Sequence, residues 1–295
     1  MSVEIHTITF AGDLRLFELQ ALSIDQMLDH SQITKYRIVI NDHNEFHIRE
    51  SILSFINRCI SLALQRKIEI VLSSKYLTTG MDGWKDQQYL KLFSVADSVA
   101  EWVVVLDSKN HFVKHTAIND FFYSGKAKTH FCEPPPSQLP WLDKSLAFFH
   151  VNNFQLLAMP TVTPYTMKPS LVRLMVNAIR TDPRIHDKQN IFSAHSLDRA
   201  SEFFLYYAFL LKLGSIDDYY HASPRLCETL YTVWPQDRGT VTRYLSAIAS
   251  GEYHVFGLHR KRLPQLSAKE RQMIGDIWQV LRLPMPAAYY LEFTT

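Results

Sequence analysis

A carboxylate at the end of a long apolar segment is the most informative feature of this sequence. Residues Trp102 to Leu106 are all apolar, and Asp107 follows them directly in the run WVVVLDSKN. In open α/β sheets, ligands bind in the crevice at the carboxyl ends of the strands. A carboxylate placed there could coordinate a divalent cation bound to a diphosphate, since hard cations take oxygen ligands. The alternative is that Asp107 only caps a turn.

Polar residues also follow two earlier apolar segments. Gly12 and Asp13 come after Ile5–Phe10, and Asn41-Asp42 comes after Tyr36–Ile40. The residues Ser108, Lys109 and Asn110 extend the group that begins at Asp107. If these segments are neighbouring parallel strands, their polar ends surround one crevice.

A predicted helix contributes four more candidate side chains. Trp84, Gln87, Gln88 and Lys91 are spaced i, i+3, i+4 and i+7, so they lie on one face of that helix. Two carboxamides and an ammonium group could hold sugar hydroxyls and a phosphate. The alternative is a solvated helix face with a packed tryptophan at its start.

Glu202 is a candidate general base. It begins an otherwise apolar helical segment and shares a face with Leu205, Tyr206 and Phe209. A carboxylate beside aromatic rings can have a raised pKa, which would suit it to accept a proton from an acceptor hydroxyl. The alternative is a carboxylate at a helix start that the helix dipole stabilises.

His259 precedes a run of three cations, Arg260, Lys261 and Arg262. Its imidazole could complete a metal site with Asp107, while one of the cations neutralises a diphosphate. The alternative for the basic run is a solvated face.

Short apolar runs that alternate with helical periodicity predict the elements that position these residues. We expect strands at 5–10, 36–40, 68–72 and 102–106, with helices up to about residue 28 and at 49–65 and 83–99. Three strand–helix units before Asp107 predict a parallel-type sheet. Later segments predict strands at 156–162 and 254–258, helices at 169–180, 200–213 and 267–281, and a proline-rich surface loop at 132–140.

The composition limits the class of protein. The chain has 295 residues, and its 31 basic and 29 acidic residues give a formal net charge of +2, so no global field holds a nucleic acid. The three cysteines fit neither a disulfide framework nor a CxxC metal site. There is no signal-like start and no apolar run of about 18 residues. We expect a cytoplasmic protein, with peripheral attachment to the inner face of the membrane left open.

Four segments, taken in order, resemble a bacterial family of GT-A-type glycosyltransferases found among polysaccharide-synthesis proteins. They are the opening strand with Ala11-Gly12-Asp13, GWKDQQYLKL from Gly83, LDSKNHFV from Leu106, and SEFFLYYAFL from Ser201. The resemblance covers roughly residues 5–260. It implies a GT-A-like, Rossmann-type central sheet flanked by helices, with a helical C-terminal part. We expect a single domain with a donor-binding half at 1–125, an acceptor-side half at 126–265 and a C-terminal helix and tail at 266–295.

The resemblance also implies site roles. It makes Asp107 and Glu202 the catalytic residues and places a nucleotide-sugar donor against Ala11, Gly12, Asp13, Asn41, Asp42, Gln88, Lys91, Ser108, Lys109, Asn110 and Arg260. It places an acceptor near Trp84, Thr163, Tyr165 and Tyr206. GT-A enzymes hold Mg²⁺ or Mn²⁺ with an Asp-X-Asp motif, in which Asp107 takes the first position and Lys109 the last. A protonated lysine cannot ligate a metal, so either Asp107 acts with another ligand such as His259, or Lys109 replaces the charge of the cation.

The expected function is transfer of a sugar from a nucleotide-sugar donor to a hydroxyl of a bacterial surface polysaccharide, with inversion if Glu202 is the base. One alternative is a sugar nucleotidyltransferase, which usually needs a glycine-rich loop after the first strand, where this chain has only Gly12. Another is a catalytically degenerate scaffold of polysaccharide assembly, which the lysine in the acidic motif favours.

Overall fold

A five-stranded sheet forms the centre of the computed structural model, which describes residues 1–77, 83–152, 157–188 and 191–292. The strands are β1 (Val3–Thr9), β2 (Lys35–Ile40), β3 (Ile68–Leu72), β4 (Trp102–Asp107) and β8 (Tyr165–Met167). Their order is β3-β2-β1-β4-β8, and every neighbouring pair is parallel except β4 and β8. The sequence-based prediction of an α/β fold with a mainly parallel sheet is therefore confirmed.

Two small sheets extend this centre. One has the order β10-β11-β5 and the other β6-β7-β9. Their strands are β5 (Asn110–Phe112), β6 (Phe122–Tyr123), β7 (Lys126–Thr129), β9 (Tyr220–Ala222), β10 (Cys227–Leu230) and β11 (Val255–Leu258). Because β5 follows β4 after a two-residue turn, the first of these sheets adjoins the carboxyl end of β4.

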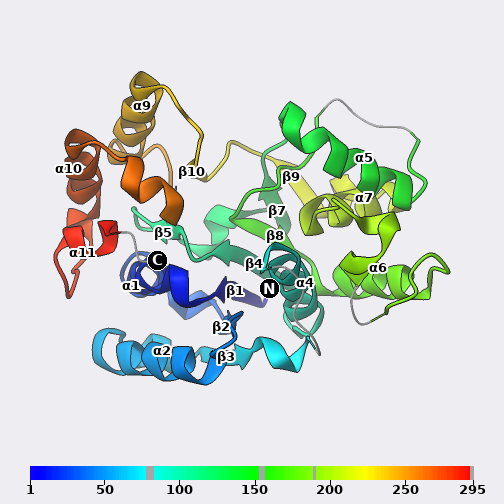
Figure 1. Ribbon diagram of the computed structural model, residues 1–295, viewed down its shortest axis with the longest axis horizontal. Helices are drawn as coiled ribbons and strands as arrows, with labels where there is room; N and C mark the ends of the chain where they lie inside the picture. The colour runs from blue at the N-terminus through cyan, green and yellow to red at the C-terminus, as the bar shows by residue number, and fades with distance from the viewer. Residues whose placement is uncertain (78–82, 153–156, 189–190, 293–295) are drawn as a thin grey trace.

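Helices surround the sheets. The α-helices are α1 (Leu14–Met27), α2 (Glu45–Cys59), α3 (Leu62–Gln65), α4 (Gly83–Ala96), α5 (Leu139–Phe148), α6 (Pro169–Thr181), α7 (Glu202–Leu213), α8 (Ile216–Tyr219), α9 (Arg238–Ala249), α10 (Ala268–Ile277) and α11 (Ala287–Leu291). The 3₁₀ helices are η1 (Ala11–Asp13), η2 (His30–Gln32), η3 (Ser73–Lys75), η4 (Ile118–Phe121), η5 (Pro136–Gln138), η6 (Ile191–Ser193), η7 (His195–Leu197), η8 (Arg260–Gln265) and η9 (Trp278–Val280). In Figure 1, α9, α10 and α11 gather on one side of the sheet, and α5, α6 and α7 on the other.

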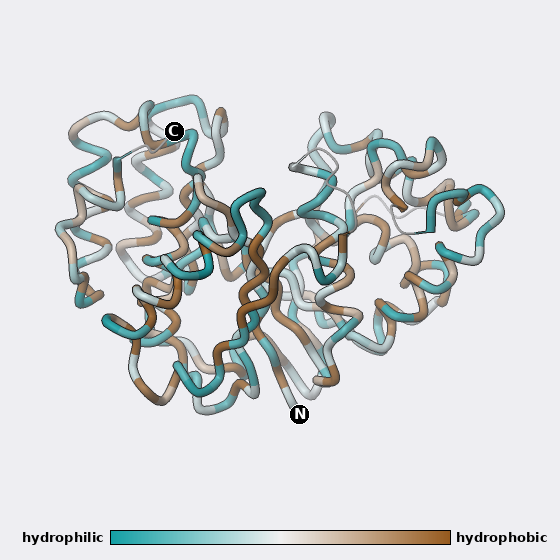
Figure 2. The backbone as a smooth tube through the Cα atoms, turned by 60° about the horizontal axis from the view of Figure 1, so that its bottom comes forward, coloured by the Kyte–Doolittle hydropathy of each residue, from teal (hydrophilic) through white to brown (hydrophobic). Residues whose placement is uncertain are grey.

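One hydrophobic cluster contains residues from Val3 to Leu291, so all three predicted segments of the chain contribute to it. In Figure 2 the apolar strands, coloured brown, lie near the centre of the molecule. The long apolar run of β4 is explained by this position, because Trp102 to Leu106 are all buried there.

Three predicted elements differ from the structure. The proline-rich loop expected at 132–140 contains η5 and the first two residues of α5, because the first turn of a helix tolerates proline, as at Pro140. The helix expected at 49–65 is interrupted between α2 and α3. The strand expected at 156–162 is wrong for its described part, where Ala158 makes only an isolated bridge to Cys132; residue 156 lies outside the described residues. Pro160 and Pro164 lack the N–H that a central strand needs, and the edge strand β8 begins only at Tyr165.

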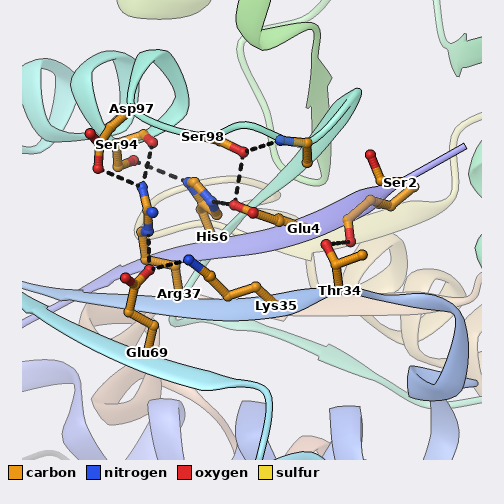
Figure 3. A network of polar contacts seen from close by, with 12 residues as sticks. Ser2, Glu4, His6, Thr34, Lys35, Arg37, Glu69, Ser94, Asp97 and Ser98 are labelled. Atoms are coloured by element: carbon orange, nitrogen blue, oxygen red, sulfur yellow. Dashed lines mark hydrogen bonds and ion pairs between the residues drawn. The ribbon is translucent and has the colours of Figure 1, made fainter.

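A buried polar network joins β1, β2 and β3 to the C-terminal end of α4 (Figure 3). His6 Nε2 lies 2.9 Å from Glu4 Oε2, and His6 Nδ1 lies 3.4 Å from Ser94 Oγ. Arg37 donates to Glu69 and to Asp97. His6 and Ser94 have no solvent-exposed area, so this Glu–His–Ser arrangement satisfies buried polar groups rather than serving a substrate.

Candidate functional site

A cleft with a volume of about 450 Å³ opens at the carboxyl ends of β1, β2 and β4. It is lined by Ile8, Phe10, Asp13, Asn41, Gly83, Trp84, Gln87, Asp107, Ser108, Lys109, His259, Arg260 and Lys261. Ten of the residues that the sequence singled out are among them: Asp13, Asn41, Trp84, Gln87, Asp107, Ser108, Lys109, His259, Arg260 and Lys261. The strand ends and the basic turn, far apart in the sequence, thus meet at one edge of the sheet.

Asp107, the last residue of β4, lies between two ammonium groups. Its Oδ1 is 2.8 Å from Lys91 Nζ, and its Oδ2 pairs with Lys109 Nζ and accepts a hydrogen bond from Thr163 Oγ1 at 3.1 Å. Burial raises the pKa of Asp107, but the charges of Lys109 and Lys91 outweigh it and hold that pKa well below its usual range. The carboxylate is therefore ionised and fully paired.

Lys91 connects Asp107 to Glu202. The Nζ atom of Lys91 is 3.1 Å from Glu202 Oε1, and Gln88 Oε1 accepts a hydrogen bond from Glu202 N at 3.0 Å. Burial lowers the pKa of Lys91, but the two carboxylates raise it above its usual range. Gln88 and Lys91 are buried, so the solvated-face alternative is wrong for this part of α4, whereas Trp84 and Gln87 line the cleft.

Glu202 is the first residue of α7 and is only 4% exposed. Both sequence-based interpretations of this residue were incomplete, because neither included Lys91 as its partner. Glu202 is not among the residues that line the cleft. In this arrangement its carboxylate contacts Lys91, which is likewise not a lining residue.

The turn after Asp107 is held from behind by buried polar groups. Asn110 Oδ1 accepts hydrogen bonds from Asp107 N at 2.9 Å and from Thr163 Oγ1 at 2.6 Å. Gln20 Nε2 donates to the carbonyl oxygens of Asp107 and Asn110, and Ser108 Oγ donates to Ile8 O. Asn110 is fully buried, so the structure places it behind the cleft wall, where it supports the turn.

The end of β1 approaches the basic turn closely. A Cβ atom on Gly12 would lie 3.3 Å from Arg260 Cζ and 2.8 Å from the ring of Phe10, so only glycine fits there without a shift. Arg260 Nε is 3.3 Å from Asp13 Oδ1. Burial raises the pKa of Asp13 to about 6, although Arg260 and Lys109 act in the opposite direction.

Asp42 supports the neighbouring strand end from outside the cleft lining. Its carboxylate accepts hydrogen bonds from Ala11 N and Asn44 N, each at 2.9 Å. Ala11, Gly12 and Asp42 therefore shape the cleft, while Asp13 and Asn41 face it.

The pairing of β5 with β11 brings the basic turn to the cleft, and sequence analysis did not predict this pairing. Leu258 N donates to Lys109 O at 2.9 Å. The next residue, His259, caps η8 by accepting a hydrogen bond at Nδ1 from Lys261 N. Burial lowers the pKa of His259 to about 4, with Lys109 and Arg260 acting in the same direction, so the imidazole is neutral at pH 7.

Asp107 and His259 do not fit a divalent cation in this structure. Both carboxylate oxygens of Asp107 are taken by ammonium groups. Within the described ranges, no group of three or more His, Cys, Asp or Glu side chains could hold a metal ion. The positive charge near Asp107 comes from lysine instead.

The expected acceptor-side residues separate into two groups. Trp84 is 44% exposed and lines the cleft. Thr163, Tyr165 and Tyr206 are buried and do not line it. Tyr206 Oη accepts from Lys168 N, and Tyr165 Oη donates to Phe203 O, so these two rings belong to the core.

Comparisons with known proteins give similarities to solved structures and a matching family model. Mouse xyloside xylosyltransferase 1, in its apo form, matches with 12% sequence identity and a TM-score of 0.44, covering 87% of this chain and 97% of that one. A likeness of this size carries no argument about activity. A comparison with curated proteins found no match. None of the helices in the described part of the chain is long and apolar enough to span a membrane. A family model matches residues 1–259, and the chain therefore belongs to DUF6492, a family of unknown function.

Proposed function

We propose that this protein is a glycosyltransferase that moves a sugar from a nucleotide-sugar donor to a hydroxyl of a saccharide acceptor, such as a bacterial surface polysaccharide. The observation that carries the proposal is the cleft at the carboxyl ends of β1, β2 and β4, where Lys109, Arg260 and Lys261 lie together. Its volume falls in the range of roughly 300–1,000 Å³ that is typical of small-molecule sites. Three cations at the switch edge of a parallel sheet suit a diphosphate.

The aromatic residues of the cleft suit the rest of the donor. The rings of Phe10 and Trp84 both line the cleft, and Trp84 packs at 5.5 Å from the ring of Trp141. A nucleobase or a sugar ring can stack on such a surface, while Asn41 offers a carboxamide for hydrogen bonding.

In the reaction, the acceptor oxygen forms a bond to the anomeric carbon while the bond from that carbon to the phosphate oxygen breaks. The electron pair leaves with the nucleotide, and Lys109, Arg260 and Lys261 stabilise the charge that develops there. The acceptor proton goes to a base. We assign that role to Asp13, because it lines the cleft and its pKa of about 6 lies near the working pH.

Glu202 and Lys91 then act as positioning residues. They hold Asp107, and Asp107 in turn holds Lys109 toward the cleft. No step in this proposal passes through a metal ion.

The test is calorimetric titration with UDP, GDP, dTDP and CMP and with UDP-glucose and GDP-mannose, each in EDTA and with Mg²⁺ or Mn²⁺. We expect at least one of these compounds to bind in EDTA, and Lys109→Ala to weaken its binding by about tenfold, the loss of roughly 1.4 kcal/mol. The matched control is Lys269→Ala, an exposed lysine on α10. If none of these compounds binds under any metal condition, the proposal is wrong.

Turnover separates the alternatives. Release of free nucleotide from a nucleotide sugar, with an oligosaccharide acceptor panel present, supports the transferase. Pyrophosphate release from a nucleoside triphosphate plus a sugar phosphate would identify a nucleotidyltransferase. Tight binding without turnover on a broad donor panel would identify a scaffold.

A further inference from the structure

A second, smaller pocket lies beside η8 and shares no lining residue with the donor cleft. It has a volume of about 170 Å³ and is lined by Val233, Gln236, Arg238, Arg262 and Gln265. Side chains three residues apart in a 3₁₀ helix lie on the same side. Arg262 and Gln265 therefore face this pocket together, whereas Arg260 and Lys261 line the cleft.

Arg262 is the unusual member of this pocket. It is only 4% exposed, and its Nε atom has no hydrogen-bond partner among the residues that the structure describes. In that same part of the chain, its guanidinium group forms no ion pair. Burial lowers the pKa of Arg262, while Glu270 lies near enough for its charge to raise that pKa. A buried charge without a hydrogen-bonded partner lowers the stability of the fold. An anion that binds this guanidinium group would remove that cost.

The neighbouring charges leave an excess of positive charge. Arg238 Nη1 pairs with Glu270 Oε2, and Arg238 Nη2 donates to the carbonyl oxygen of Gln265 at 3.2 Å. Glu270 thus has one counterion in Arg238, while its Oε1 atom is buried without a hydrogen-bond partner among the described residues. Two arginines against one glutamate give the group a net charge of +1.

We propose that this pocket is a binding site for a phosphate group, held by the guanidinium groups of Arg262 and Arg238 and by the carboxamides of Gln236 and Gln265. The pocket is smaller than the roughly 300–1,000 Å³ of sites for drug-sized ligands, so it suits a small anionic group. Guanidinium groups bind phosphate through paired N–H donors, which the free Nε side of Arg262 supplies. The proposal does not depend on nucleotide binding in the cleft.

The phosphate has two sources that the surroundings of the pocket allow. Val233 lines the pocket and is 62% exposed, and the adjacent Trp234 is 59% exposed. Exposed tryptophan beside cations is typical of surfaces that contact lipid headgroups. The group is therefore either a soluble phosphate or the phosphate of an anionic lipid, and the experiment separates the two.

The first arm measures soluble phosphate. Inorganic phosphate is titrated calorimetrically, at constant ionic strength, into a Lys109→Ala/Arg260→Ala background in which the cleft has lost two of its cations. We expect Arg262→Met to weaken the binding that remains by at least tenfold and Arg243→Met, a matched exposed arginine on α9, to leave it unchanged. If Arg262→Met does not fold, Arg262→Lys serves instead, because it keeps the charge and loses the paired donors.

The second arm measures lipid. Sedimentation with phosphatidylglycerol vesicles, compared with phosphatidylcholine vesicles, is done on the wild type, Arg262→Met and Trp234→Ala. Loss of sedimentation in both variants supports a lipid source, and phosphate binding without sedimentation supports a soluble one. If neither phosphate nor vesicles respond to Arg262, the proposal is overturned and Arg262 only balances Glu270. Nucleotide binding by the Arg262→Met variant is measured in parallel. If nucleotide binding is unchanged, a loss of phosphate or vesicle binding comes from this pocket and not from the cleft.

Discussion

The ammonium nitrogen of Lys91 lies 2.8 Å from Oδ1 of Asp107, and this pair joins helix α4 to the carboxyl end of β4. The same nitrogen lies 3.1 Å from Glu202 at the start of α7. The consecutive elements α4 and β4 thus meet the distant helix α7 at one buried cation. Because Asp107 also holds Lys109, the position of a cleft cation depends on a buried network.

Replacing Lys91 should be strongly destabilising. Lys91→Met leaves two largely buried carboxylates without their shared cation, and breaking such a pair costs about 3–5 kcal/mol. The free energy of unfolding from urea denaturation measures this. Adding Glu202→Gln to Lys91→Met should recover part of the loss, since one uncompensated charge is removed. A cost as small as that of Lys85→Met, on the same helix and more exposed, would contradict the network.

Affinity for a nucleotide sugar should increase as the pH falls through 6. The pKa of Asp13 is raised to about 6, so below that pH its carboxyl is neutral, Arg260 loses its negative partner and the cleft becomes more positive. His259 stays neutral in this range because its pKa is lowered to about 4. For a partly exposed charge worth up to about 1 kcal/mol, we expect a gain of roughly threefold to fivefold between pH 7.5 and 5.5.

The measurement uses the tightest-binding diphosphate sugar of the panel, because its two phosphates keep one charge each over this range. Asp13→Asn should bind it with similar affinity at both pH values, and should transfer sugar much more slowly if Asp13 is the base. A wild-type affinity that does not vary with pH would count against the titration of Asp13.

The strand ends were predictable, because continuous apolar runs identify buried parallel strands and their polar ends then share an edge. Ile68–Leu72 was predicted with the bounds that the structure has, and β4 differs by one residue. Asp13, Asn41 and Asp107 follow from the same reasoning. Of the α-helices in the described residues, α5, α8, α9 and α11 were missed. In α9, the apolar spacing of Val241, Leu245 and Ile248 after the Asp237 cap was a usable signal.

The pairings within the site were not predictable from local patterns. Helical spacing placed Gln88 and Lys91 on one face, but only the packing of α7 decides that this face is buried. Lys91 and Glu202 are 111 residues apart, and spacing says nothing about such a contact. The arrival of His259 and Arg260 at the cleft likewise depends on the β5–β11 pairing.

Gly257 in β11 should not tolerate a side chain. A Cβ atom there would overlap the hydroxyl of Thr229 on β10 and lie 2.9 Å from its Cγ2 atom, and β-branched threonine cannot swing away easily. Gly257→Ala should cost about 1–3 kcal/mol in urea unfolding and also weaken nucleotide binding, since β11 leads directly into His259 and Arg260. Thr229→Ala should partly rescue it. Gly275→Ala in α10, where the nearest atom is an ordinary 3.8 Å away, is the control and should be neutral or stabilising.

His111 should make the protein less stable in mild acid. It is fully buried on β5, its Nε2 accepts a hydrogen bond from Trp278 Nε1 at 2.7 Å, and burial lowers its pKa to about 3. Between pH 7 and 5 the unfolded chain therefore binds a proton at this residue and the native chain does not. The free energy of unfolding must fall with pH in that window, by about 2 kcal/mol at pH 5 for this residue alone.

The test compares unfolding free energies at pH 7 and pH 5 for the wild type and His111→Leu. The variant loses the Trp278 hydrogen bond and should be weaker at pH 7, but its decrease on acidification should be about 2 kcal/mol smaller. The change in unfolding free energy between pH 7 and pH 5 separates titration from packing. A purely structural cost lowers the unfolding free energy by the same amount at both pH values. His43→Leu, an exposed histidine before α2, controls for loss of a histidine elsewhere and should retain the wild-type slope. An unchanged slope in His111→Leu would show that this imidazole is not the acid-sensitive group.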